Sequence, residues 1–257
     1  MSAVNVPILL TSSVVAHDTG VALNDTAERL RLTLESLEQW LKLDPQLRIV
    51  LCDGSGFDFS RIVSEKFPLA EIECLHFENR QDLVNQYGRG YGEGEIVRYA
   101  LAHSKFIANS GCFAKCSAKL WVENFAQCLS GWNGSILCKG VFLNVFSLFK
   151  NTTFSYVDTR FYIASCASYK KHLENAHFQI NKEHGHSLEE CFKDVFMKYN
   201  LEKILFNTPP VICGVGGGTG TYYNNSPTRK LKERLRLTMV RMNKKFTHLF
   251  SKDQANL

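Results

Sequence analysis

Residues 87–123 read YGRGYGEGEIVRYALAHSKFIANSGCFAKCSAKLWVE. A predicted turn opens this stretch, with glycine at positions 88, 90, 92 and 94. A helix-like run follows, and the apolar residues Cys112 to Cys116 predict a strand that ends in the basic, polar tip 115–119. A glycine-rich turn, a helix, a strand and a charged tip are typical of an α/β protein, in which ligands bind at the carboxyl ends of strands.

The first 80 residues predict strands that alternate with helices. Asp25 and Glu28 have the spacing of a capping box at the start of the first helix, and a second helix is expected over 59–67. The predicted strands are Val6–Val15, Arg48–Cys52 and Ile72–Phe77. Strand, helix and strand at this spacing form a βαβ unit, which implies parallel pairing. We therefore expect an α/β protein with a mixed sheet flanked by helices.

Two later segments, 135–149 and 153–165, alternate aromatic and β-branched residues. They predict strands of a second sheet region. Within them, Asp158 and Arg160 are two residues apart and should face the same side of a strand. The pair has two interpretations: it binds a sugar hydroxyl and a phosphate, or its members bond to each other.

The composition is that of one large domain with an appendage. The chain has 257 residues, of which 45% are hydrophobic, and nine scattered cysteines indicate free thiols in a reducing compartment. No basic segment precedes the apolar residues 6–10, and no apolar run approaches the ~20 residues of a membrane span. We expect a cytoplasmic protein with a main domain over 1–225 and a tail over 226–257.

The tail is predicted to be a basic amphipathic helix. Residues 229–253 contain nine Lys/Arg and two acidic residues, a net charge of +7, whereas the rest has 21 basic and 23 acidic residues. One face is expected to carry Leu231, Leu235, Met239, Met242, Phe246 and Leu249 or Phe250. Such a helix has two interpretations. It binds an anionic membrane surface through residues 229–252, or it packs on its own domain and leaves a solvated basic face. No motif indicates a nucleic-acid partner.

Polar residues at the ends of the first two strands are candidates for nucleotide binding. Thr11 and Ser12 end the first strand, and Asp53 ends the second, where a carboxylate can accept hydrogen bonds from a ribose or a base. The alternative for Asp53 is a turn formed with Gly54 and Ser55. The glycine-rich turn is not a dinucleotide-binding loop, because it comes late and carries the repelling carboxylates of Glu93 and Glu95.

The same stretch resembles the GT-A glycosyltransferases, in which a strand ends in a D-x-D motif that holds a metal on the donor diphosphate. It is also similar to bacterial surface-polysaccharide transferases with G-x-G-Y-G-E-G-E and F-x-K-x-x-x-K/R runs, here residues 88–95 and 113–119. The D-x-D place holds Lys115, Ser117 and Lys119. A metal-independent enzyme could use these lysines to stabilise the leaving diphosphate, or they are solvated strand-end residues. A divalent metal, Mn²⁺ or Mg²⁺, stays an alternative, with Asp158 as its ligand.

The resemblance also implies roles for individual residues. It places Arg89, Gly90 and Glu93 against a nucleotide-sugar donor, with Arg160 near the diphosphate. The alternative for the glycines of this turn is close packing of helix and strand. It implies a catalytic base in the acidic pair Glu189 and Glu190, of which Glu190 is also explained by a capping box with Ser187. His184 and His186 are alternative bases, and the glycines of 214–220 indicate a lid or a flexible connector.

Three functions therefore stay open. The resemblance implies transfer of a sugar to a lipid-linked, lipopolysaccharide or capsule glycan at the cytoplasmic face of the inner membrane. A sugar nucleotidyltransferase is the rival enzyme, but it should carry a basic loop after the first strand, and residues 11–20 contain no Lys or Arg. A non-catalytic relative that binds glycans or membranes is the third possibility.

Overall fold

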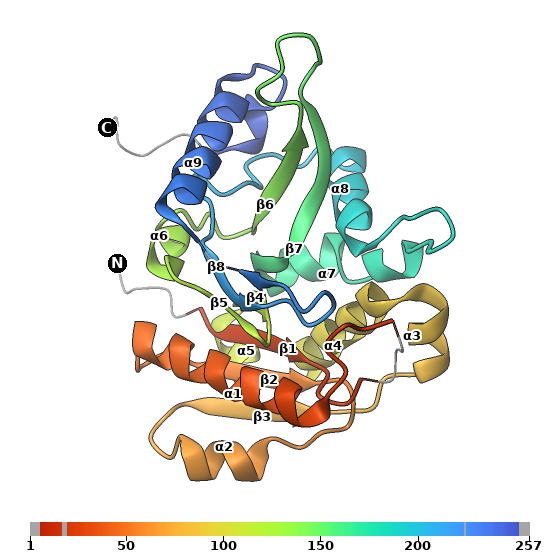
Figure 1. Cartoon of the computed structure of the whole chain (residues 1–257), viewed down its shortest axis with the longest axis vertical. Helices are drawn as coiled ribbons and strands as arrows, with labels where there is room; N and C mark the ends of the chain where they lie inside the picture. Colours follow the sequence, from red (N-terminus) through yellow and green to blue (C-terminus); the bar gives the residue numbers. More distant parts are fainter. Residues whose placement is uncertain (1–5, 17–19, 224, 252–257) are drawn as a thin grey trace.

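The computed structural model describes residues 6–16, 20–223 and 225–251. Its centre is a six-stranded mixed sheet in the order β3-β2-β1-β4-β7-β6 (Figure 1). The strands of this sheet are β1 (Ile8–Ser12), β2 (Ile49–Asp53), β3 (Ile72–His76), β4 (Cys112–Ser117), β6 (Ile136–Leu143) and β7 (Thr153–Ser165). A smaller sheet contains β5 (Leu120–Val122), β8 (Ile212–Val215) and β9 (Tyr222–Tyr223).

Helices flank the central sheet, as the sequence predicts. In chain order they are α1 (Thr26–Leu43), α2 (Ser60–Lys66), α3 (Gln81–Tyr87), α4 (Arg89–His103), α5 (Lys105–Ser110), α6 (Phe125–Ser130), α7 (Cys166–His172), α8 (Leu188–Lys198) and α9 (Pro227–Met242). Two short 3₁₀ turns, Ala176–Gln179 and Thr247–Leu249, join them. Within the described residues, no helix is both long and apolar enough to cross a bilayer.

The parallel half of the sheet confirms the predicted βαβ units. Strand β1 pairs in parallel with β2 and β4, and β2 pairs in parallel with β3. Every residue of β1 and β2 is buried, which is typical of strands covered on both faces. Strands β6 and β7 do not form a separate sheet: β7 pairs antiparallel with β4 and with β6, so the prediction of a second sheet region is wrong.

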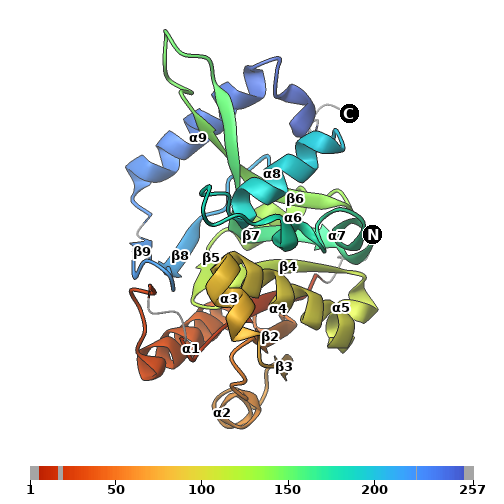
Figure 2. The same ribbon diagram turned by 90° about the vertical axis from the view of Figure 1, so that its right-hand side faces the viewer.

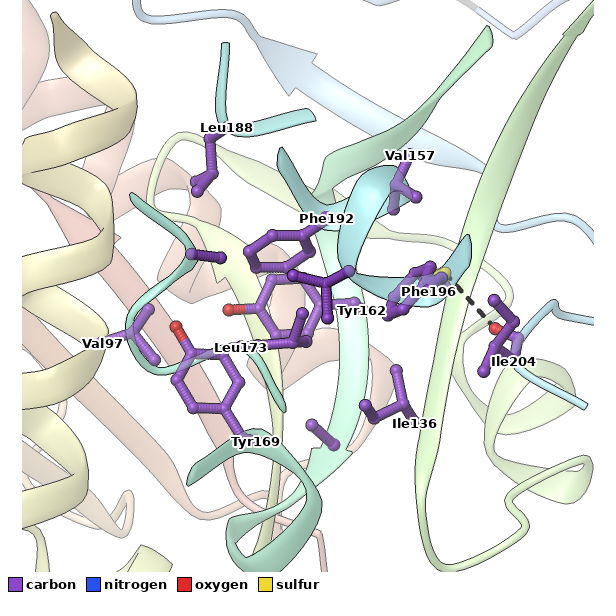
Figure 3. Close-up of a cluster of buried hydrophobic side chains, with 14 of the residues drawn as sticks. Val97, Ile136, Val157, Tyr162, Tyr169, Leu173, Leu188, Phe192, Phe196 and Ile204 are labelled. Atoms are coloured by element: carbon purple, nitrogen blue, oxygen red, sulfur yellow. Dashed lines mark hydrogen bonds between the residues drawn. The ribbon is translucent and has the colours of Figure 1, made fainter. Parts of the chain in front are cut away.

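Two apolar clusters cover the two faces of the sheet. One cluster joins buried side chains of α1, α2 and α6 to the sheet. The other joins α4, α7 and α8 to the opposite face, where Val97 of α4 and Phe192 of α8 lie in the same cluster as Tyr162 of β7 (Figure 3). These clusters fix α4 and α8 relative to the ends of β1, β4 and β7.

The predicted helix caps are present. The Asp25 carboxylate accepts a hydrogen bond from the Glu28 amide at 2.6 Å, but this is half of the predicted capping box, because the Glu28 side chain pairs with Arg31. The Ser226 hydroxyl accepts a hydrogen bond from the Arg229 amide at 3.3 Å. Ser187 and Glu190 form the predicted capping box at the start of α8. Each cap satisfies an amide that would otherwise lack a partner in the first turn.

The predicted glycine-rich turn is wrong in extent. Only Gly88 forms the break between α3 and α4, with a φ of 94°, whereas Gly90, Gly92 and Gly94 lie within α4. These three glycines allow close packing: a Cβ at Gly90 would lie 2.9 Å from Leu188 Cβ, and one at Gly94 would collide with the His177 ring. The spacing that indicated a loop therefore serves contact between α4 and the elements packed on it.

The C-terminal segment returns to the main body of the protein. After α9, Phe246, Leu249 and Phe250 are buried in the same cluster as Tyr162. The division at residue 225 stays a prediction. Lys252, the last residue of the predicted basic segment, lies outside the described residues.

Candidate functional site

A cleft lies at the carboxyl ends of β1 and β4, where the fold class places ligands. We call it the strand-end cleft; it holds about 900 Å³ of space, including its opening to solvent. Thr11 and Ser12 enter it from β1, and Lys119 enters from the turn after β4. Arg89 and Glu93 enter from the first turns of α4. Five of the predicted donor-binding residues thus lie together.

Three cations face this cleft, and none forms an ion pair with another described residue. They are Arg29, Arg89 and Lys119. The Arg29 guanidinium donates hydrogen bonds to the carbonyl oxygens of Ser13 and Leu23, the latter at 2.7 Å. Because neutral carbonyl groups hold Arg29, its charge stays available for an anionic ligand.

Arg29 was not a predicted site residue. It lies in the first turn of α1 and is buried, on the helix row that continues through Thr33, Leu37 and Trp40. A charged residue at the start of a buried row is the signal that could have identified it, because burial of an unpaired charge is costly unless it has a partner or a ligand.

Lys119 has an unusual charge state. Burial, followed by the nearby Arg29 cation, lowers the pKa of Lys119 from 10.5 to about 7. Near neutral pH part of the population therefore has a neutral Lys119 amine, which can gain a proton when an anion enters the cleft.

Three polar atoms in the cleft wall have no hydrogen-bond partner among the described residues. They are the hydroxyls of Thr11 and Ser12 and the side-chain oxygen of Asn79. The amide nitrogen of Asn79 donates to the carbonyl of Gly92 at 3.3 Å, which directs the side chain. Buried polar atoms are nearly always paired, so unpaired ones in a cleft wall point to a ligand or water as partner.

The glycine-rich loop between β8 and β9 covers the cations. A Cβ at Gly217 would lie 2.6 Å from Lys119 Cε, and one at Gly218 would collide with the Arg89 guanidinium. The carbonyl of Gly218 accepts a hydrogen bond from the Ala22 amide at 3.2 Å. The loop therefore has the position of the predicted lid, and its movement stays a prediction.

A second cleft adjoins the first and shares Arg89 and Glu93 with it. We call it the α8 cleft, because Ser187 and Glu189 enter it from the start of α8. Glu189 accepts hydrogen bonds from Thr159 Oγ1 at 3.1 Å and from Ser187 Oγ at 2.5 Å. A carboxylate has about four lone-pair sites, so Glu189 retains the capacity to accept a further proton donor.

Of the other predicted residues near α8, some line the α8 cleft and Glu190 caps the helix. Gly90 lines the α8 cleft. The Glu190 carboxylate accepts from the Ser187 amide at 3.0 Å; burial opposes ionisation, but hydrogen bonding to Ser187 lowers the pKa of Glu190. The Ser187 hydroxyl lies 2.5 Å from both Glu189 and Glu190, and its one proton serves one of the two at a time. His186 also lines the α8 cleft and pairs with Asp194 at 3.3 Å, whereas His184 does not line it.

Lys115 and Glu93 form a buried pair between the two clefts. Lys115 Nζ lies 2.7 Å from Glu93 Oε1 and donates to the Thr159 carbonyl at 2.9 Å. Burial raises the pKa of Glu93, and the Lys115 cation opposes this shift. Lys115 has no solvent exposure and lines neither cleft, so it acts on a ligand through the cleft-lining residues it contacts, Glu93 and Ser117, the latter at 3.3 Å.

Asp53 also lies beneath the surface. Its carboxylate accepts hydrogen bonds from the amides of Val14 at 2.9 Å, Ser55 at 2.7 Å and Phe57 at 3.2 Å. It does not line the strand-end cleft. Asp53 joins the loops that follow β1 and β2 and so shapes the wall of the cleft from behind.

Asp158 and Arg160 face the same side of β7, as predicted, but they lie in a different groove. They form a two-point ion pair, with distances of 2.8 and 2.6 Å, and the Arg160 guanidinium stacks on Tyr223 at 4.6 Å. Burial opposes ionisation, but the contacts with Arg160 lower the pKa of Asp158. Both residues line the groove under α9, away from the strand-end cleft. The interpretation in which they bond to each other is therefore the one the geometry supports.

The described side chains of the strand-end cleft do not fit a divalent cation. Among them the lining carboxylate, Glu93, is paired with Lys115, and three further cations face the same space. Mg²⁺ and Mn²⁺ prefer oxygen ligands that include free carboxylates. Among the described residues, no group of three His, Cys, Asp or Glu side chains could hold a metal ion.

Comparisons with known proteins give similarity in fold. No family model and no curated protein matches the sequence. The solved structures that match include the inositol-1-phosphate CTP transferase of T. maritima, at 10% identity, with 94% of this chain and 98% of that chain covered and a TM-score of 0.48. A candidate nucleotide-diphospho-sugar transferase from Desulfovibrio desulfuricans matches at 8% identity, 79% coverage of both chains and a TM-score of 0.48.

The bifunctional IspDF of Campylobacter jejuni is similar at 13% identity with a TM-score of 0.42, covering 74% of this chain. The present chain spans only 47% of the length of that protein. At such identities and TM-scores, the similarity to these transferases assigns no activity to this chain.

Proposed function

We propose that the protein is a glycosyltransferase that moves a sugar from a nucleoside diphosphate donor to an acceptor hydroxyl. The observation that supports this most directly is the group of three cations, Arg29, Arg89 and Lys119, beside the hydroxyls of Thr11 and Ser12. Among the described residues, these cations form no ion pair and these hydroxyls have no hydrogen-bond partner. A diphosphate supplies the negative charge and the acceptor oxygens that such a group requires. The adjoining α8 cleft supplies space for the acceptor.

In this reaction the bond between the anomeric carbon and the β-phosphate oxygen breaks, and the acceptor oxygen bonds to the anomeric carbon. The nucleoside diphosphate leaves with two electrons and gains negative charge, which Arg29, Arg89 and Lys119 stabilise. Glu189 takes the proton of the acceptor hydroxyl, a role that fits inversion at the anomeric carbon. Lys115 holds Glu93 at the boundary between donor and acceptor.

The finer assignment concerns the acceptor. We propose a lipid-linked, lipopolysaccharide or capsule glycan at the cytoplasmic face of a membrane, from the resemblance of residues 88–95 and 113–119 to bacterial surface-polysaccharide transferases.

A second candidate is a sugar nucleotidyltransferase, in which a sugar phosphate attacks the α-phosphate of a nucleoside triphosphate and pyrophosphate leaves. The absence of Lys and Arg in 11–20 counts against it in the sequence. However, Arg29, Arg89 and Lys119 bring three cations to the end of β1 from other elements. Basic residues that reach this place through the fold could hold a triphosphate.

One experiment separates the two candidates. The purified chain is incubated in EDTA, and separately with Mn²⁺, with a panel of nucleotide sugars or with nucleoside triphosphates plus sugar 1-phosphates. Release of nucleoside diphosphate from one nucleotide sugar supports glycosyl transfer, whereas release of pyrophosphate supports the nucleotidyltransferase. If no nucleotide of either class raises the melting temperature or reacts, both candidates are refuted.

A further inference from the structure

Helix α9 turns charged residues towards the protein and apolar residues towards solvent, the reverse of a usual surface helix. Its inward side carries Lys230, which pairs with Glu123 at 2.8 Å, and Glu233, which pairs with Lys139 at 3.2 Å. Its outward side exposes an apolar row at spacings of four, four and three residues: Leu231, Leu235, Met239 and Met242. The first four residues of the predicted row lie together on this exposed side, but the prediction is wrong for Phe246 and for Leu249 or Phe250, which follow the end of α9 and are buried.

Basic residues border the apolar row. Residues 226–251 contain eight Lys/Arg and one acidic residue, Glu233. At 100° per residue, Lys232 lies on one side of the row and Arg234 on the other, and both are exposed. An apolar strip between basic borders is typical of a helix that lies in the interface of an anionic bilayer.

A second apolar element lies beside α9. The predicted strand 135–149 ends at Leu143, and the remaining residues form the tip of the β6–β7 hairpin. At this tip Leu148 is 93% exposed and Phe149 is 96% exposed, and the cation Lys150 follows them. Two neighbouring large apolar side chains that are almost wholly in water would gain free energy if a partner covered them.

The tip and the helix belong to the same end of the molecule. The Arg236 guanidinium lies 5.8 Å from the ring centre of Phe146, and the rings of Phe142 and Phe246 are 5.0 Å apart. The hairpin projects at the end of the molecule opposite α2, with the C-terminal part of α9 beside it (Figures 1 and 2).

We propose that the hairpin tip 144–150 and the outer face of α9 form one docking surface for a bilayer that contains anionic lipids. The basic borders complement phosphate headgroups, and the apolar row and tip enter the boundary with the acyl chains. A folded protein partner is less suited, because the exposed apolar residues form a narrow strip and a projecting tip rather than a broad face. This surface is separate from both clefts, so the proposal is independent of the reaction.

The test uses the full chain and flotation with two kinds of vesicle, phosphatidylcholine alone and phosphatidylcholine mixed with phosphatidylglycerol. We expect binding to the anionic vesicles, with an apparent Kd that rises about fivefold for each basic residue neutralised, as in K232Q or R234Q. The double variant Leu148→Ser with Phe149→Ser should weaken binding at least about tenfold. Leu235→Ser with Met239→Ser should do the same.

Leu69 provides the matched control. It is 98% exposed in the loop between α2 and β3, at the other end of the molecule, so Leu69→Ser should leave vesicle binding unchanged. All substituted side chains are exposed, and an unchanged melting temperature confirms that each variant folds. Equal binding to both vesicles, no binding to either, or hairpin variants that bind like the wild type would overturn the proposal. So would a wild-type dimer that the same substitutions dissociate, because a second copy would then occupy the surface.

Discussion

Nucleotide-sugar binding should weaken as the pH rises through neutrality, because Lys119 loses its proton in that range. Burial and the Arg29 cation place the pKa of Lys119 at about 7 in the free protein. The diphosphate would bind the ammonium form, and its negative charge would return the pKa of Lys119 towards the ordinary value for lysine. Binding is therefore coupled to the uptake of a proton above pH 7.

The size of the effect follows from the fraction of Lys119 that is protonated before binding. With a pKa of about 7, this fraction is about nine-tenths at pH 6 and about 3% at pH 8.5. If only the protonated form binds the donor, affinity falls about thirtyfold across this range, or ~2 kcal/mol.

The assay is calorimetric titration with the nucleotide sugar that the panel identifies, because a diphosphate esterified at both ends has no titrating phosphate in this range. Repeating it in buffers of different ionisation enthalpy counts the protons taken up. Lys119→Arg should bind with a flat pH profile, since arginine stays charged, and Lys119→Met should bind weakly with a flat profile. A wild-type profile that is flat, or a slope that persists in Lys119→Met, would refute the reasoning.

Three further predictions concern the two clefts. Glu189→Gln should lower kcat by about 10²- to 10⁴-fold with little change in donor affinity, as initial rates would show. Glu190→Gln should lose ~1 kcal/mol of stability, because its capping hydrogen bond is weakened, but should keep most of its rate; urea unfolding and initial rates test this. Gly218→Ala should displace the flexible Arg89 side chain and weaken donor binding about tenfold with little change in melting temperature, as calorimetry and thermal unfolding would measure. Thr11→Val should stabilise the free protein by ~1 kcal/mol, because it removes an unpaired buried hydroxyl, and should weaken donor binding; equal affinity in both proteins would contradict a ligand role.

The sequence predicts best those features that depend on neighbours along the chain. Apolar runs identify β1, β2 and β3, and side-chain caps identify the starts of α1, α8 and α9. The grouping of Thr11, Ser12 and Lys119 was also predictable, because the carboxyl ends of parallel strands lie at one edge of a sheet.

Features that depend on distant contacts could not be predicted in this way. Close packing was one of two interpretations of the glycines at 90 and 94, but the sequence could not name their partners, Leu188 and His177, which are about 80 to 100 positions away along the chain. Asp158 offers a carboxylate that suits a metal site, but its neighbour Arg160 neutralises it in another groove. Periodicity identifies the apolar row of α9 but does not say whether the row faces the protein or solvent. Ion pairs of α9 with Glu123 and Lys139 decide this, because they turn the polar side of the helix towards the rest of the protein.

The buried cations also imply a cost in stability that a ligand would offset. In the unfolded chain Lys119 has the ordinary lysine pKa of 10.5, whereas in the folded protein its pKa is about 7, so the unfolded state binds more protons between these values. Stability should therefore rise as the pH increases from 7 to 10.5, and the full penalty below pH 7 is on the order of 5 kcal/mol. Lys119→Met should be more stable than the wild type at pH 6.5, and its advantage should shrink towards pH 10. Urea unfolding at the two pH values tests this without any nucleotide, and an advantage that does not change with pH would show that Lys119 is not held in a low-pKa state.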